Sequence, residues 1–264
     1  MYFYIYDSFL VGKKYTKLID KVETRVASLD IAGKKIQLSI LKNITEIIED
    51  IFKKNILKEP LTVVVIGGDT TFYQAALPLA NKDAVLGFIP VEPDSAIANI
   101  LGLPVNEYAA DVISARLIEK ISFGKINGEH FFSSLEFPVE QAVLTCDGKY
   151  QIKPKNVKIA KVINLDLLQF TQPSSSPDFK RMVSNPQDDY LEVLLGNPGA
   201  NWLLFKKKEK KDSLFFVKTL KIESKKPNEE ILITADGKRT IKTPALVEIA
   251  PEFLKVIVGK DRLI

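Results

Sequence analysis

The chain has 264 residues, of which 46% are apolar and 27% are charged, and its formal net charge is +4. This length allows one large domain or two ordinary ones, and the apolar content supports a buried core. The sequence contains one cysteine and one histidine, which excludes an intrachain disulfide and the usual His/Cys zinc site. It contains no apolar run near the ~20 residues of a membrane span and no leading basic region of a signal peptide, so we expect a cytoplasmic protein.

The first 120 residues alternate between strand-like and helix-like stretches. Apolar runs predict strands over residues 2–6, 35–40, 61–66 and 84–89. Apolar residues at helical spacing predict helices over residues 13–29, 44–52, 71–79, 95–101 and 107–120. This alternation is typical of an α/β domain, here residues 1–120, with a parallel sheet covered by helices on both faces. Ligands of such sheets bind beyond the carboxyl ends of the strands.

The pattern changes after about residue 120, where helical periodicity fades. Strand-like stretches follow at residues 131–137, 140–145, 157–165, 191–195, 202–206, 214–223 and 230–234. The pairs Asp147-Gly148 and Asp236-Gly237 are typical of hairpin turns. The sequence therefore predicts a second, β-rich domain over residues 121–243, folded as a β-sandwich.

The third predicted strand runs directly into Gly67, Gly68 and Asp69, and a predicted helix follows. A strand, a glycine turn and a helix together offer bare backbone N–H groups to a phosphate, and the missing Cβ atoms let the ligand approach closely. The pattern indicates an anion or nucleotide site, although strand-to-helix turns also use glycine for purely steric reasons. A second loop, from Pro90 to Ser95, leaves the next predicted strand. The two turns would meet in one crevice if their strands are neighbours.

Several motifs resemble those of the diacylglycerol kinase catalytic-domain family, the bacterial lipid kinases related to sphingosine kinases and, more distantly, to NAD kinases. Residues 67–71 (GGDTT) resemble that family's GGDGT, and residues 87–90 (GFIP) with 101–104 (LGLP) resemble the frame of its GxIPxGTxNDxARxLGxP block. Residues 188–193 (DDYLEV) resemble DDGxLEV, and residues 236–238 (DGK) resemble DGE. The matches follow the family's order, and the resemblance implies that the C-terminal residues 244–264 return to the first domain.

The resemblance implies an ATP-dependent lipid kinase, which transfers a phosphoryl group to the hydroxyl of diacylglycerol or a similar lipid. Asp69 would organise Mg–ATP or take a proton, and Asp236 would assist the acceptor hydroxyl. Asp188 and Asp189 match an acidic patch that holds a metal in some family members. The nucleotide would contact the two turns through Gly67, Gly68, Thr70, Thr71, Pro90 and Ser95.

Each of these aspartates also has a structural alternative. Asp69 can cap the helix that starts near Thr70, and Asp236 can serve as a plain hairpin residue, as Asp147 does in a second Asp-Gly-Lys sequence. Asp188 and Asp189 can belong to a solvated loop before a strand. The sequence leaves these alternatives open.

The departures from the family's motifs fall on residues that would contact the nucleotide. Thr70 replaces the third glycine of GGDG, Lys238 replaces the glutamate of DGE, and Glu92 and Asp94 lie where the family has its GTxND loop. Each carboxylate about 5 Å from a phosphate would cost roughly 3 kcal/mol at an effective dielectric near 20, unless the loop points to solvent. We therefore expect impaired ATP-dependent activity. The alternative is a non-catalytic relative that binds another ligand or a partner protein.

The partners are less well defined by the sequence. Residues 206–211 (KKKEKK) predict a basic hairpin tip, which either contacts an anionic lipid surface or is a solvated turn that protects an edge strand. The scattered basic residues and the lack of a binding signature argue against a nucleic acid. The resemblance leaves a homodimer open, because relatives in that family can dimerise, but no residue identifies an interface.

Overall fold

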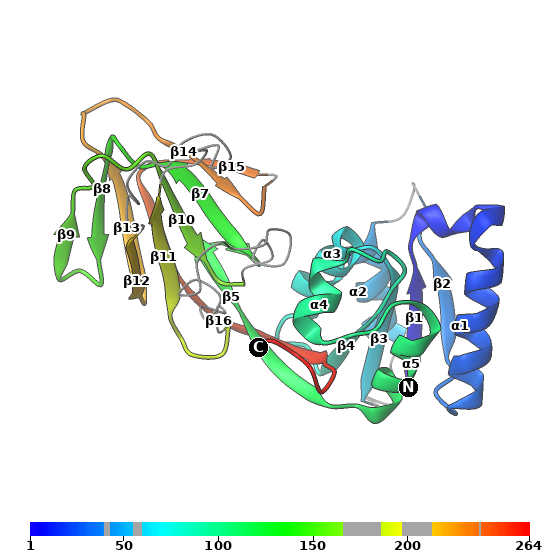
Figure 1. The fold of residues 1–264 in the computed structure, drawn as a ribbon. Coiled ribbons are helices and arrows are strands. Elements are labelled where there is room, and N and C mark those ends of the chain that lie inside the picture. Colours follow the sequence, from blue (N-terminus) through cyan, green and yellow to red (C-terminus); the bar gives the residue numbers. More distant parts are fainter. Residues whose placement is uncertain (40–42, 55–59, 166–185, 197–212, 238) are drawn as a thin grey trace, which may run out of the picture. The chain divides into compact units, whose positions relative to one another are not determined.

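A computed structural model describes residues 1–39, 43–54, 60–165, 186–196, 213–237 and 239–264. The chain divides into two compact units (Figure 1). The first contains the described residues up to Ile121 and the C-terminal residues from Glu252, and the second contains the described residues between Ser122 and Pro251. The predicted strand over residues 202–206, the lysine-rich residues 206–211 and Lys238 lie outside the described residues.

The first unit is built on a parallel sheet. Its strands are β1 (Tyr2–Tyr6), β2 (Lys34–Gln37), β3 (Leu61–Gly67) and β4 (Ala84–Pro90), in the order β2-β1-β3-β4. The last part of β16 (Ala245–Ile257) extends this sheet, because Val256 pairs in parallel with Leu86 of β4. Every residue of β3 and β4 is buried, as expected for strands covered on both faces.

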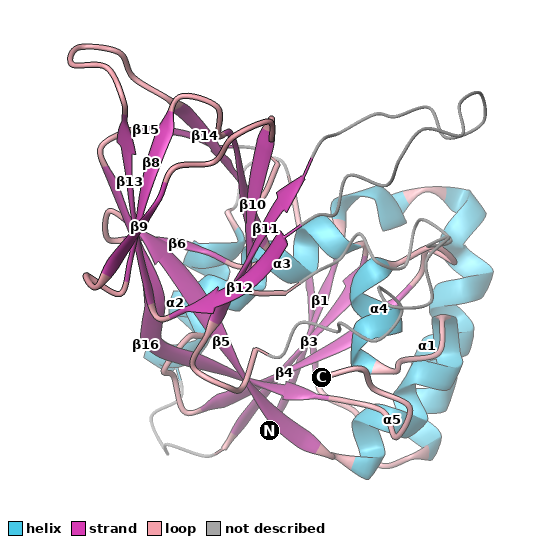
Figure 2. Ribbon diagram, turned by 60° about the vertical axis from the view of Figure 1, so that its left-hand side comes forward, coloured by secondary structure: helices cyan, strands magenta, loops and turns pink. Residues whose placement is uncertain are grey.

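Helices cover both faces of this sheet (Figures 1 and 2). They are α1 (Thr16–Ser28), α2 (Ile44–Lys54), α3 (Asp69–Leu79), α4 (Ala96–Leu101) and α5 (Ala109–Ala115). On one face, Val22 and Val26 of α1 and Ile113 of α5 join a buried cluster with alternating strand residues such as Val64 and Ile66. In another part of the unit, the ring of Phe72 in α3 lies 5.2 Å from that of Phe88 in β4. The predicted α/β architecture is confirmed.

The helix predicted over residues 107–120 is shorter in the structure. A 3₁₀ turn at Asn106–Tyr108 leads into α5, which ends before Arg116, where the backbone is left-handed with φ 54°. The strand β5 (Ile118–Ile126) then begins and pairs with β16. The predicted helix was too long because pairing with a strand more than a hundred residues away overrides the local pattern.

The second unit contains strands of two sheets. In one sheet, β13 (Thr219–Ser224) lies between β16 and β8 (Ala142–Cys146), β9 (Tyr150–Ile152) follows β8, and β5 pairs with both β16 and β6 (Glu129–Phe131). The other sheet has the order β12 (Ser213–Val217), β11 (Leu191–Gly196), β10 (Ile159–Ile163), β7 (Ser134–Pro138), β14 (Leu232–Ala235) and β15 (Arg239–Lys242). Buried residues from both sheets form one cluster, so the predicted sandwich is confirmed.

Two predicted strands in this unit are each divided in the structure. Residues 131–137 are shared between β6 and β7, and residues 214–223 are shared between β12 and β13, which belong to different sheets. Both predicted hairpin turns are present, at Asp147-Gly148 between β8 and β9 and at Asp236-Gly237 between β14 and β15. No helix in the described part of the chain is long and apolar enough to cross a membrane.

Candidate functional site

The two turns singled out in the sequence lie side by side. Strands β3 and β4 are neighbours, and their register pairs Gly67 with Pro90. Beyond the last paired residues, the backbone N–H of Val91 donates to the carbonyl of Gly67 at 3.1 Å. The glycine turn after β3 and the loop after β4 therefore form one site at the carboxyl edge of the sheet, where ligands of such sheets bind.

Asp69 joins these two turns through its carboxylate. It accepts hydrogen bonds from the hydroxyl of Ser95 at 2.5 Å and from the backbone N–H groups of Ala96 at 2.9 Å and Ile97 at 3.3 Å. Ser95 is itself the N-cap of α4 and accepts from the N–H of Ala98 at 2.9 Å. The carboxylate thus satisfies N–H groups at the start of α4, which have no partner within their own helix.

Asp69 therefore caps a helix, although not the helix that the structural alternative named. That alternative was a cap on the helix that starts near Thr70. The structure places Asp69 in the first turn of α3, whose N-cap is Gly68 without a side-chain hydrogen bond. Thr70 is exposed in the same regular first turn.

Asp7 completes the site and was missed by the sequence reasoning. It follows β1 directly, is only 8% exposed, and its carboxylate accepts a hydrogen bond from the hydroxyl of Thr71. A Cβ added to Gly67 would lie 2.6 Å from the Cβ of Asp7 and 2.8 Å from its Oδ2. Gly67 is thus required by the close packing of Asp7, which is the steric alternative left open by the sequence. The signal was available, because Asp7 stands at the carboxyl end of a buried strand.

Gly68 differs from Gly67 in the side chain that lies nearest to it, which is that of Glu92. The three heavy atoms nearest to an added Cβ all belong to the carboxyl group of Glu92, and the nearest, Oε2, is at 3.0 Å. Glu92 is exposed and lies in the loop after β4. The chain's own carboxylate therefore lies over the glycine whose backbone an anionic ligand would approach.

These carboxylates are not neutralised within the described residues. Asp7, Asp69, Glu92 and Asp94 form no ion pair with a lysine or arginine in the described ranges. Two other residues were predicted to contact the nucleotide. The hydroxyl of Thr71 donates a hydrogen bond to Asp7, and Pro90 is buried at the end of β4. The turn has the open backbone that an anion needs, but the side chains around it oppose a triphosphate. In this arrangement the side chains would repel a triphosphate whose charge is not neutralised by a metal ion.

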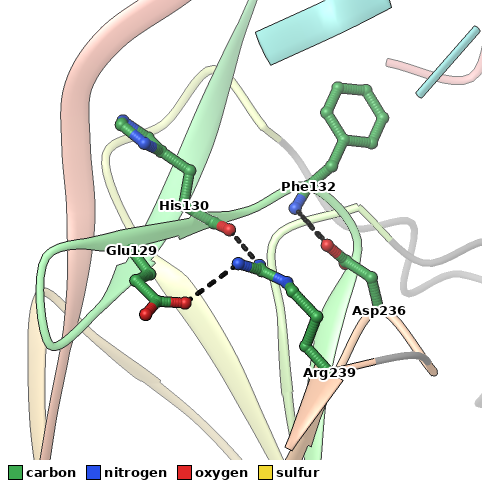
Figure 3. A network of polar contacts seen from close by, with 5 residues as sticks. All are labelled: Glu129, His130, Phe132, Asp236 and Arg239. Carbon is green, nitrogen blue, oxygen red and sulfur yellow. Dashed lines mark hydrogen bonds and ion pairs between the residues drawn. The ribbon is translucent and has the colours of Figure 1, made fainter. Parts of the chain in front are cut away.

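Asp236 lies in the second unit and holds a turn together (Figure 3). Its carboxylate accepts from the backbone N–H groups of Phe132 at 3.0 Å, Ser133 at 2.7 Å and Ser134 at 3.3 Å. Nearby, Arg239 donates to Glu129 at 3.1 Å and to the carbonyl of His130.

Asp147 anchors its own hairpin in the same way. Its carboxylate accepts from the N–H groups of Lys218 at 2.8 Å and Thr219 at 2.9 Å. Both aspartates have φ 49°, and each is followed by a glycine that also has positive φ. The matching geometry of Asp147 favours the hairpin reading of Asp236.

Asp188 and Asp189 are exposed in a turn before β11. One carboxylate oxygen of Asp188 accepts from the N–H of Tyr190 at 3.0 Å, and Asp189 has a left-handed backbone with φ 59°. Among the residues that the structure describes, no group of three or more His, Cys, Asp or Glu side chains could hold a metal ion. Magnesium at this pair remains a prediction.

The single cysteine, Cys146, is fully buried in the sandwich core. Burial raises the pKa of its thiol. A thiol acts as a nucleophile only as the thiolate, so Cys146 is an apolar core residue in this fold and contributes no chemistry.

Comparison with known proteins adds the fold likeness. No protein-family model matches the sequence, and no curated protein matches it significantly. The solved structure of a diacylglycerol kinase from Bacillus anthracis str. Sterne has a TM-score of 0.75 and 18% identity, with 100% of this chain and 98% of the other covered. A putative diacylglycerol kinase from the same organism gives 0.75 and 17%, over 98% and 97% of the two chains. An NAD kinase from Archaeoglobus fulgidus, solved in complex with ATP, gives 0.60 and 10%, over 100% and 96%. At these identities the likeness shows a shared fold over the whole chain.

Proposed function

We propose that the protein is a lipid kinase-like protein whose ATP-dependent phosphorylation of a lipid hydroxyl is impaired. The kinase side of the proposal is supported by a fold shared with diacylglycerol kinases over the whole chain and by the motifs in the same order. The main support for the impairment is the position of the Glu92 carboxylate against Gly68.

The balance of charges at the glycine turn favours weak nucleotide binding. The N-terminus of α3 would attract a phosphate by about 0.3–1 kcal/mol. A carboxylate about 5 Å away repels one phosphate charge by about 1 kcal/mol in water and about 3 kcal/mol at an effective dielectric of 20. Glu92 is exposed, which puts it near the lower value, but Asp7 is almost fully buried. Without a bound metal ion, the repulsion from Glu92 at that distance, about 1 kcal/mol, is at least as large as the attraction of the helix.

The hydrogen bonds of the two candidate catalytic aspartates support the same proposal. A general base needs an oxygen within hydrogen-bond reach of the proton that it accepts. The oxygens of Asp69 already accept from Ser95 and the start of α4, and those of Asp236 accept from backbone N–H groups of residues 132–134. Both aspartates primarily hold turns in place in this proposal.

The alternative function is a non-catalytic protein of the same fold that binds another ligand or a partner protein. The crowding of carboxylates at the carboxyl edge of the sheet favours a ligand that is not a polyphosphate. Both functions use the same scaffold and differ in whether any phosphoryl transfer takes place.

A transfer assay separates the two. The protein is incubated with γ-labelled ATP, magnesium and a panel of lipids that carry a free hydroxyl, including diacylglycerol. We expect labelling far below the 1–100 s⁻¹ that is typical of kinases. Magnesium-dependent labelling in that range would contradict the proposal if the Asp69→Asn variant loses the labelling. The Asp94→Asn variant is the control, because it makes the same change of charge in the neighbouring loop, and it should keep the labelling.

A further inference from the structure

The sheet that contains β8 and β13 ends at β9 (Tyr150–Ile152), the second strand of the β8–β9 hairpin (Figure 1). Within the described part of the chain, β9 pairs with β8 on one side and with no strand on the other. An edge strand of this kind presents backbone N–H and C=O groups to which another extended chain can add. The backbone and the charges of the hairpin indicate which kind of chain fits.

The hydrogen bonds at the turn show which residue of β9 faces the open side. The carbonyl of Cys146 accepts from the N–H of Lys149 at 2.9 Å, so Cys146 directs its backbone groups toward β9. Backbone groups alternate in direction along an antiparallel strand, so the preceding residue, Thr145, directs its groups toward β13. Gln151 is paired with Thr145 and therefore directs its own N–H and C=O away from β8. It offers one donor and one acceptor at the open edge.

The segment around β9 is strongly basic. Residues 148–158 contain no acidic residue and four exposed lysines, namely Lys149, Lys153, Lys155 and Lys158. The first three form no ion pair within the described ranges. The carboxylate of the turn, that of Asp147, accepts from the backbone N–H groups of Lys218 and Thr219. The open edge of this sheet therefore carries positive charge on both sides of Gln151.

This charge distinguishes between the chains that could add to β9. A second copy of the protein would pair β9 with itself, and a twofold axis at Gln151 would place Lys149 of one copy opposite Lys153 of the other. Like charges in directly opposite positions destabilise a strand pair. Lysines on an edge strand prevent pairing with neutral or basic strands for the same reason. A strand that brings carboxylates to these positions meets opposite charges instead.

The observations thus favour an acidic peptide chain. A nucleic acid would match the lysines, but it has no extended peptide backbone to pair with Gln151. We propose that β9 binds an acidic segment of a partner protein, which adds to the sheet as an extended strand. The segment pairs with the backbone of Gln151, and its carboxylates contact Lys149 and Lys153. The proposal goes beyond the proposed function, because this binding requires neither ATP nor a lipid.

The test is fluorescence anisotropy of the full chain with a labelled peptide in which glutamate alternates with valine. We expect this peptide to bind, and we expect its affinity to fall as salt rises. A peptide with glutamine in place of each glutamate should bind about tenfold more weakly or less. Lys149→Gln/Lys153→Gln should lower the affinity for the acidic peptide about tenfold, because two exposed ion pairs are lost. The control Lys13→Gln/Lys14→Gln removes the same charge from exposed positions of the first unit and should change nothing.

The backbone part of the proposal is tested at Gln151. Gln151→Pro removes the N–H that faces the open edge, where proline is tolerated, and should lower the affinity about fivefold. Gln151→Ala keeps this N–H and should bind like the unchanged protein. Methylation of the backbone nitrogens of the acidic peptide should weaken its binding to the unchanged protein in the same way, without any change to the protein.

Thermal unfolding should show that all variants are folded. Equal losses for Gln151→Pro and Gln151→Ala, or for the two lysine pairs, would overturn the proposal. So would tighter binding of a single-stranded oligonucleotide than of the acidic peptide, or no binding of that peptide at all.

Discussion

Replacing Asp69 with alanine should lower the free energy of unfolding by about 3 kcal/mol and the melting temperature by about 9 °C. The carboxylate accepts hydrogen bonds from Ser95, Ala96 and Ile97, so its loss leaves the start of α4 without a cap and disconnects the two turns. Thermal and urea unfolding measure the effect. Asp69→Asn should lose less, because one acceptor oxygen remains.

Asp94→Ala is the matched control for this experiment. Asp94 is an exposed carboxylate in the same loop and caps no helix in the described part of the chain, so its removal should change stability by less than about 0.5 kcal/mol. If Asp69→Ala were as stable as the unchanged protein, the carboxylate would not be what holds α4, and a role in binding or catalysis would become the better explanation.

Gly259→Ala should destabilise the first unit by about 3 kcal/mol or more. An added Cβ would lie 1.8 Å from the carbonyl oxygen of Gly102, which ends α4 in a left-handed conformation. The surrounding backbone is held by hydrogen bonds from Gly259 to the carbonyl of Leu101 at 2.7 Å and from Leu263 to that of Ile100 at 2.9 Å. Since the contact is with backbone, no side chain can turn away to relieve it.

The measurement for Gly259 is chemical unfolding, together with hydrogen exchange of the amide of Leu263, which should lose protection. Gly148→Ala provides the comparison, because Gly148 has φ 63° but nothing within 4 Å of an added Cβ. It should cost only about 1 kcal/mol of backbone strain. Equal losses for the two variants would mean that the C-terminal segment does not pack against α4 as the structure shows.

The framework of the first unit could be predicted from the sequence because its strands are buried. Strands that are buried on both faces, such as β3 and β4, leave continuous apolar runs, and their order with the helices indicates a parallel sheet. The resemblance also singled out residues 101–104, and the structure gives Gly102 a local reason, since it closes α4 against the C-terminal segment.

The parts that were missed depend on contacts between residues far apart in the chain. β16 is 13 residues long with a mixed burial pattern, and only pairing with β4, β5 and β13 makes it a strand. The chain passes from one sheet to the other at Lys218, and the sequence predicted a single strand across this point, over residues 214–223. Local periodicity contains no information about such pairing.

The same limit applied at the candidate site. The sequence predicted that Gly67 and Gly68 share a role, but the structure separates them, with Gly67 packed on Asp7 and the carboxyl group of Glu92 nearest to Gly68. The sequence left open whether Asp69 caps its own helix, and the helix that it does cap lies after the next strand, at a distance of 27 residues in the chain. The residues that Asp69 and the two glycines contact can be identified only once the register of the neighbouring strands is known.

Titration calorimetry with Mg–ATP shows whether Glu92 stands in the path of an anionic ligand at the glycine turn. The unchanged protein should bind weakly, and Glu92→Gln should tighten binding about fivefold for each phosphate charge about 5 Å away. Asp83→Asn removes the same charge from an exposed position before β4, at the opposite end of that strand, and should change nothing. Tight binding by the unchanged protein that Glu92→Gln leaves unaltered would contradict the claim.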